Sequence, residues 1–197
     1  MVFMFFCCPA ILLKINLPLG WGFLIFEIKE IECKMDKIFL LLGSNLGDRL
    51  SNLMAATELI QDTIGQIERS SSIYASEPWG YKSNQQFINQ LIIVSSSLLP
   101  ETVLSRILSI EKQLGRERRP NGLSDRTIDI DILFYGNRVI NSPKLTIPHP
   151  AIEVRLFALL PLAEIANGFM QPKSHKSMDS LLQECKDNGL VEKIPGP

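Results

Sequence analysis

Several signatures of common nucleotide-binding and metal-binding proteins are missing from this chain of 197 residues. It contains neither the GxxxxGK(S/T) pattern of a P-loop nor a GxGxxG stretch after a strand-like run. Its four cysteines form no CxxC pair and show no zinc-like spacing with the two histidines. No internal repeat or low-complexity stretch occurs. These absences exclude a P-loop enzyme, a Rossmann dinucleotide-binding domain and a zinc-stabilised module.

An excess of charge of either sign is also missing, because 20 Lys and Arg residues face 21 Asp and Glu residues, for a net charge of −1. Without a global field, neither nucleic acid nor an anionic membrane is an expected partner, and any positive site must be local. Only Cys185 lies after residue 34, so this larger part cannot contain an internal disulfide. That composition is typical of the reducing cytoplasm, where we expect the protein to reside.

Long apolar runs are missing as well. The most apolar stretch, residues 1–28, is interrupted by Pro9, Lys14 and Pro18 and falls short of the roughly 20 apolar residues of a membrane span. It lacks the positive start and the small-residue cleavage site of a signal peptide. We expect residues 1–34 to be a non-native or disordered N-terminal extension, with residues 35–197 forming a single domain. A membrane-associating segment is the alternative, and mass spectrometry of the natural N-terminus decides between the two.

The rest of the chain alternates between strand-like and helix-like patterns. The expected elements are a strand at 38–42, a helix at 48–64, strands at 66–74 and 87–97, a helix at 100–114, a strand at 127–134 and a helix at 153–166. The run 38–42 is apolar throughout, as in a strand buried on both faces. This order matches the split βαβ, ferredoxin-like arrangement, an α+β sandwich with helices on one face of a mostly antiparallel sheet. Such a fold hosts many functions, so it does not by itself predict the chemistry.

Two aspartates separated by one residue, Asp129 and Asp131, stand in the expected strand 127–134. Residues two apart project to the same face of a strand, so both carboxylates lie together while the isoleucines around them enter the core. Like charges this close repel each other, and a buried charge without a partner is costly. Mg²⁺ would compensate the pair, since it binds one or two carboxylates together with phosphate oxygens. The alternative is a solvated pair on an exposed strand.

Four arginines lie just upstream of this acidic pair, namely Arg116, Arg118, Arg119 and Arg126. Guanidinium groups bind phosphate oxygens bidentately and stay charged at any working pH. A cationic loop beside metal-binding carboxylates suits a nucleoside triphosphate, whose charge shifts during phosphoryl transfer. The alternative is a solvated basic loop paired with Glu117 and Asp125.

Aromatic residues and an amide gather in the segment 77–89, which contains Glu77-Pro78-Trp79-Gly80-Tyr81 and then Phe87 and Asn89. Flat heteroaromatic ligands are held by stacking between rings, while an amide forms hydrogen bonds with their polar edge. Phe87 also fits an ordinary core position, because it begins a strand. His149 lies between two prolines, which favours an imidazole aimed at a cavity, although a lone histidine is more often structural.

Together these residues resemble the 6-hydroxymethyl-7,8-dihydropterin pyrophosphokinase family. The resemblance covers about residues 37–166 and rests on five motifs: Leu42-Gly43-Ser44-Asn45-Leu46-Gly47, Phe87-Ile88-Asn89-Gln90, Gly115-Arg116-Glu117-Arg118, Asp125-Arg126-Thr127-Ile128-Asp129-Ile130-Asp131-Ile132 and Leu145-Thr146-Ile147-Pro148-His149-Pro150. It implies transfer of pyrophosphate from Mg-ATP to 6-hydroxymethyl-7,8-dihydropterin in folate biosynthesis, with attack of the hydroxymethyl oxygen on the β-phosphorus and release of AMP.

The resemblance also implies a role for each matching residue. Asp129 and Asp131 would hold two Mg²⁺ ions, and Arg116 and Arg126 would be catalytic arginines that grip phosphates. The ATP-binding residues would be Arg118, Thr146, His149 and Arg155. The pterin-binding residues would be Pro78, Trp79, Gly80, Phe87, Asn89 and Phe157, with the two phenylalanines sandwiching the ring.

Two other readings remain open. A catalytically inactive protein that binds nucleotide or pterin would use the same pocket, although retention of both carboxylates and the main arginines disfavours it. A ferredoxin-like nucleic-acid-binding module would need a basic face with stacked aromatics, and the aspartates put negative charge there. We therefore expect small-molecule substrates, no nucleic acid or membrane partner, and a monomer.

Overall fold

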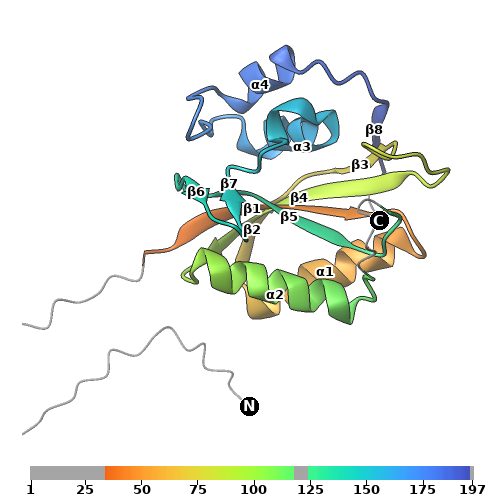
Figure 1. Cartoon of the computed structure of the whole chain (residues 1–197), viewed down its shortest axis with the longest axis horizontal. Coiled ribbons are helices and arrows are strands. Elements are labelled where there is room, and N and C mark those ends of the chain that lie inside the picture. Colours follow the sequence, from red (N-terminus) through yellow and green to blue (C-terminus); the bar gives the residue numbers. More distant parts are fainter. Residues whose placement is uncertain (1–33, 118–123, 196–197) are drawn as a thin grey trace, which may run out of the picture. The chain divides into compact units, whose positions relative to one another are not determined.

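The computed structural model describes residues 34–117 and 124–195 (Figure 1). Of the expected extension 1–34, only Lys34 falls within the described residues. A six-stranded sheet has the order β5-β1-β4-β3-β8, with β2 also pairing to β4, and its pairs are antiparallel. Its strands are β1 (Asp36–Ser44), β2 (Gln66–Ser70), β3 (Ile73–Ser76), β4 (Phe87–Ser96), β5 (Asp129–Tyr135) and β8 (Val191–Ile194). The short strands β6 (Ile140–Asn141) and β7 (Thr146–Ile147) form a separate ribbon.

Helices cover both faces of this sheet (Figure 1). On one face, alternate β1 residues such as Ile38 and Leu40 pack against α1 (Arg49–Thr63) and α2 (Pro100–Gln113). On the other face, Phe39 and Leu41 pack against α3 (Leu156–Ala166) and α4 (Met178–Glu184). The α+β class and the antiparallel sheet are confirmed, but the expectation of helices on one face only is wrong. The reason is the apolar run in β1, which requires a cover on both sides.

Two expected elements are divided in the structure. The expected strand 66–74 is two strands, separated at Ser71, where the side-chain Oγ instead of the backbone carbonyl accepts the Leu91 N–H, at 3.0 Å. The expected helix 153–166 is a short 3-10 turn, η1 (Ile152–Val154), followed by α3. Between them Arg155 is extended, with φ −123° and ψ 103°. Arg155 lines the candidate site described below.

Residues after 167 carried no expected element, yet they form α4 and the edge strand β8. Strand β8 pairs with β3, and Lys193 Nζ lies 3.1 Å from Glu164 Oε1 on α3. Among the described helices, none combines the length and apolar character that a membrane crossing requires.

Candidate active site

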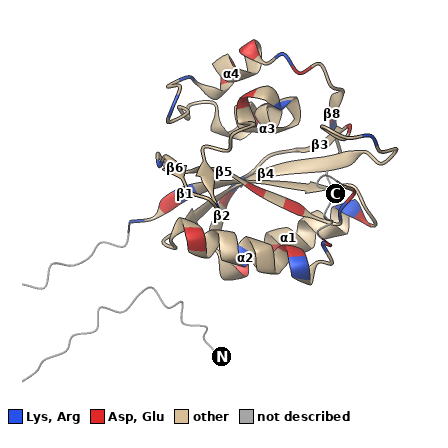
Figure 2. Ribbon diagram, viewed as in Figure 1, with Lys and Arg blue, Asp and Glu red and all other residues tan. Residues whose placement is uncertain are grey.

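Strand β5 carries two carboxylates on the face opposite its buried isoleucines. Ile130 and Ile132 lie in the core with α1 and α2, as the two-residue period predicted. Asp129 and Asp131 point instead into a cavity of about 180 Å³. Figure 2 shows these acidic positions within β5, which otherwise carries no charge. Pairing with β1 places Asp129 opposite Gly43 and Asp131 opposite Leu41.

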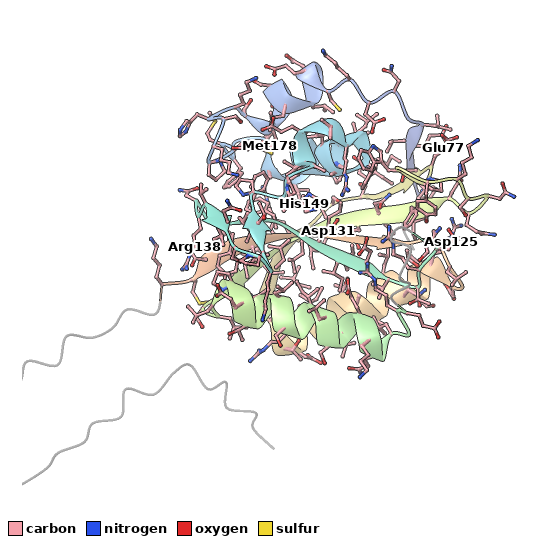
Figure 3. All side chains as sticks on the ribbon, viewed as in Figure 1. Glu77, Asp125, Asp131, Arg138, His149 and Met178 are labelled. Atoms are coloured by element: carbon pink, nitrogen blue, oxygen red, sulfur yellow. The ribbon has the colours of Figure 1, made fainter. Side chains whose placement is uncertain are left out.

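Most of the predicted site residues line this one cavity, although they come from distant parts of the chain. They are Trp79, Phe87, Asn89, Arg116, Arg126, Asp129, Asp131, His149, Arg155 and Phe157. Figure 3 shows Asp131 and His149 near each other at the centre of the domain. The cavity therefore joins charged, phosphate-suited groups to aromatic ones.

Three arginines surround the carboxylate pair. Arg116 forms a hydrogen-bonded ion pair with Asp129, and Arg126 Nη1 lies 3.2 Å from Asp129 Oδ2. Arg155 Nη1 lies 3.5 Å from Asp131 Oδ2. Among the residues that the structure describes, the buried Nε groups of Arg126 and Arg155 have no hydrogen-bond partner. A buried donor without an acceptor costs free energy, and an incoming anion such as a phosphate would remove that cost by accepting its hydrogen bond.

The end of α2 explains where Arg116 points. Gly115, with φ 79°, follows the helix as the sequence predicted, and the Arg116 N–H then donates to the Glu111 carbonyl at 2.9 Å. This turn brings the Arg116 guanidinium back to the buried Glu111 carboxylate, with which it pairs. Glu111 also accepts the Ile130 N–H at 3.0 Å, so one carboxylate ties α2, Arg116 and β5 together.

The electrostatics of Asp131 favour a bound cation. Burial raises the pKa of its carboxyl above the ordinary value, and the negative charge of Asp129 adds to that effect, while Arg155 and the other arginines oppose it. A bound metal ion would offset the free-energy cost of burying the ionised carboxylate, since it stabilises that form. Among the described residues no group of three or more His, Cys, Asp and Glu could hold a metal. Two hard carboxylates without further ligands suit Mg²⁺ that shares its remaining positions with phosphate and water.

His149 is held as a neutral donor. Its Nδ1 accepts the Ala151 N–H at 3.2 Å, which leaves the ring proton on Nε2. Burial, and after it the positive charge of Arg155, lowers the pKa of the imidazole to about 4, although the negative charge of Asp129 opposes this shift. At neutral pH the ring therefore offers one N–H to a ligand without adding charge.

The aromatic end of the cavity lies beside the arginines. The Arg126 guanidinium carbon is 5.3 Å from the Phe87 ring centroid, and that of Arg155 is 4.6 Å from the Trp79 centroid and 5.8 Å from the Phe157 centroid. Asn89 is only 3% exposed and donates from Nδ2 to Ser76 Oγ at 2.8 Å. This bond fixes an amide edge beside two phenyl rings, which suits a flat polar heterocycle.

Comparison with known protein families shows to which family a chain with this charged and aromatic cavity belongs. The model of the family described as 7,8-dihydro-6-hydroxymethylpterin-pyrophosphokinase (HPPK) matches residues 39–167. The chain belongs to the HPPK family. It is 42% identical over 132 residues to the Porphyromonas gingivalis protein named 2-amino-4-hydroxy-6-hydroxymethyldihydropteridine pyrophosphokinase, covering 66% of this chain and 90% of that relative. An Aquifex aeolicus protein of the same name is 37% identical over 150 residues, covering 76% and 92%.

Solved structures show the same fold. A Plasmodium falciparum HPPK-DHPS triple mutant with SDX-DHP superposes with a TM-score of 0.64 at 18% identity, covering 79% of this chain. The chain spans only 45% of that longer HPPK-DHPS chain. At this level of identity the likeness concerns the fold alone.

Three of the predicted HPPK site residues that the structure describes do not line the main cavity. Thr146 lines a neighbouring cavity, which shares Asp129, Asp131 and His149 with the main one. Pro78 lines a separate, more open hollow together with Asn45 and Tyr81. Gly80 has φ 81° at the tip of that loop, where its backbone turns sharply. Arg118 lies outside the described residues.

Sequence reasoning missed three residues that shape the HPPK cavity. At Gly43 a Cβ atom would lie 3.1 Å from Asn89 Oδ1 and 3.6 Å from the Phe87 ring, so glycine keeps the cavity open. Ser76 holds Asn89, and Glu111 holds Arg116. Only Glu111 had a usable signal, because its carboxylate interrupts the otherwise apolar buried residues of α2.

Proposed function

We propose that this chain is a working HPPK that uses the described cavity to transfer pyrophosphate from Mg-ATP to 6-hydroxymethyl-7,8-dihydropterin, giving the pterin diphosphate and AMP. One observation carries the assignment of the site. The cavity joins the arginine-flanked pair Asp129 and Asp131 to the aromatic residues Phe87, Phe157 and Trp79. A triphosphate and a flat heterocycle would thus be held side by side, so the reaction would gain mainly from positioning.

The polar residues have distinct proposed roles. Asp129 and Asp131 would hold two Mg²⁺ ions, which when bound neutralise phosphate oxygens and the developing charge of the transition state. Arg116 and Arg126 would shift from Asp129 to the phosphates. They would then stabilise the negative charge of the substrate in place of that of the Asp129 carboxylate. Arg155, Thr146 and the His149 Nε2–H would contact the nucleotide, with Arg118 assisting.

The pterin would lie between Phe87 and Phe157, with Asn89 hydrogen-bonding its polar edge and the Pro78–Gly80 backbone closing the pocket. Its hydroxymethyl oxygen would release its proton to solvent and form a bond to the β-phosphorus. The bond from that phosphorus to the oxygen bridging the α-phosphate would break, and AMP would leave. Residues 35–197 would act as one domain and as a monomer, in the cytoplasm.

The test is AMP release by the purified chain with Mg-ATP, with and without 6-hydroxymethyl-7,8-dihydropterin. Pterin-dependent AMP supports the proposal. Binding of both ligands without AMP release would favour the catalytically inactive binder instead.

A further inference from the structure

Just outside the cavity, a carboxylate connects three loops. Asp125, which precedes β5, accepts hydrogen bonds from Asn45 Nδ2 at 2.7 Å, from the Tyr81 hydroxyl at 3.0 Å and from Ser83 Oγ at 3.0 Å. Asn45 follows β1, whereas Tyr81 and Ser83 belong to the loop 77–86 between β3 and β4. The main cavity lining does not include Asp125, Asn45, Tyr81 or Ser83.

The same connection extends to the backbone of a cavity residue. Asn45 Oδ1 accepts the Arg126 N–H at 2.8 Å, and the Asn45 N–H donates to the Arg126 carbonyl at 3.2 Å. Asn45 is 1% exposed, so both bonds are shielded from water. These two hydrogen bonds fix the Arg126 backbone, and its side chain extends from there toward Asp129 and over the Phe87 ring.

We propose that Asp125 is a positioning residue for the HPPK reaction. Its carboxylate couples the pterin-side loop 77–86 to the phosphate-binding Arg126. The inference rests on the proposed function. Through Tyr81 and Ser83 the carboxylate holds the loop that carries Trp79, and through Asn45 it holds the backbone of Arg126. Loss of Asp125 would therefore loosen both ends of the cavity together, although the residue itself touches neither substrate.

The chemistry of the partners fits a permanent connection. Tyr81 remains a proton donor, because burial and then its hydrogen bond to Asp125 raise the pKa of its hydroxyl to about 12. Hydrogen bonds to an ionised carboxylate are about twice as strong as neutral ones. Asparagine at 125 could keep part of this pattern, whereas alanine would remove it.

The test compares Asp125→Ala and Asp125→Asn with a control, Asp36→Ala. Asp36 Oδ2 lies 2.6 Å from Arg138 Nη2, so the control also removes a tethered carboxylate. Figure 3 shows Arg138 and Asp125 at opposite ends of the domain. For Asp125→Ala we expect about a tenfold higher KM for the pterin and about a tenfold lower kcat. The Kd of a non-hydrolysable ATP analogue should also rise, about threefold, because Arg126 loses its support. Asp125→Asn should recover part of the loss, and Asp36→Ala should leave KM and kcat unchanged.

A double-mutant cycle with Tyr81→Phe tests the route. If Asp125 acts through Tyr81, the combined variant loses clearly less than the product of the two single losses. Independent, multiplicative effects would contradict coupling through this hydroxyl. Kinetic values of Asp125→Ala that match wild type, with only a lower melting temperature, would overturn the proposal.

Amide hydrogen exchange of residues 77–86 supplies a readout that does not depend on activity. We expect faster exchange in this segment for Asp125→Ala than for Asp36→Ala, well below both melting temperatures. Equal exchange would refute the loop connection. If wild type releases no AMP, the proposed function fails, and this measurement still decides whether Asp125 holds the loop.

Discussion

The two carboxylates of β5 differ in how far arginines already neutralise them. Asp129 contacts both Arg116 and Arg126, whereas Arg155 Nη1 reaches Asp131 only at 3.5 Å. That distance is long for a charge-assisted hydrogen bond. An entering cation therefore finds its more available oxygen ligands on Asp131, which makes this residue the sharper test of the metal assignment.

We expect Asp131→Ala to lower kcat/KM about a thousandfold or more, because several kcal/mol of transition-state stabilisation depend on the metal. AMP release should be measured at rising Mg²⁺ concentration, with Asp36→Ala as the control carboxylate. Near-normal turnover of Asp131→Ala at saturating Mg²⁺ would contradict a metal site at this pair.

Phe87 offers a second residue-scale prediction, since its ring lines the cavity at the start of β4. We expect Phe87→Ala to weaken pterin binding about ten- to a hundredfold through lost stacking and burial, with ATP affinity nearly unchanged. Calorimetric titration with each ligand measures both. Phe87→Leu is the matched variant, because it keeps most of the buried apolar volume and removes only the ring. Loss of ATP affinity with intact pterin binding would place the pocket elsewhere.

At the scale of single elements, β5 shows what local sequence can predict. The alternation Asp-Ile-Asp-Ile specifies both faces of the strand, so its core side and its cavity side were predictable. The pairing of Asp129 with Gly43 was not, because it depends on two segments far apart in the chain. Ser76 was missed because it acts by holding Asn89 on another strand. Glu111 holds Arg116, which lies only five residues further along the chain, so its role had a local signal.

The segment around α3 shows the opposite case, in which a helical pattern concealed a break at the candidate site residue Arg155. The apolar period predicted one helix over 153–166, yet the chain is extended at Arg155 and α3 starts at Leu156. The Arg155 side chain, at the N-cap position, makes no capping hydrogen bond. The acceptor comes from the tail that had no predicted element, because the Leu156 N–H donates to Asp187 Oδ2 at 3.0 Å.

This contact gives a prediction at the element scale, because Leu156 stands between Arg155 and Phe157. We expect Asp187→Ala to cost about 1 kcal/mol of unfolding free energy, as for a lost helix cap. The KM values for ATP and pterin should both rise about two- to fivefold, since both flanking side chains lose their support. Thermal melting and steady-state kinetics measure the two effects. Asp187→Asn should restore both, because asparagine caps as well as aspartate, and a stability loss with unchanged KM values would make the tail purely structural.

At the scale of the whole molecule, two helical layers leave the ligand only the ends of the strands. Gly43, Phe87 and Asp129 lie where β1, β4 and β5 end or begin, and all three line the cavity. The apolar run in β1 predicted burial of both faces, but the second helical layer needed α4 from the unassigned tail. The fold class was thus predictable from periodicity, whereas the cover of the second sheet face depends on long-range packing with the tail.

The same architecture predicts that residues 1–34 are dispensable. In the described part of the chain the two core clusters begin at Ile38 and Phe39, and Met35 is 52% exposed ahead of β1. We therefore expect Met35–Pro197 to melt within about 2 °C of the full chain, a difference well below 1 kcal/mol for a domain of this size. Its kcat/KM for pterin-dependent AMP release should match that of the full chain. An unchanged melting temperature with lost activity would assign the extension a role in the reaction, whereas loss of both would make it part of the folded domain.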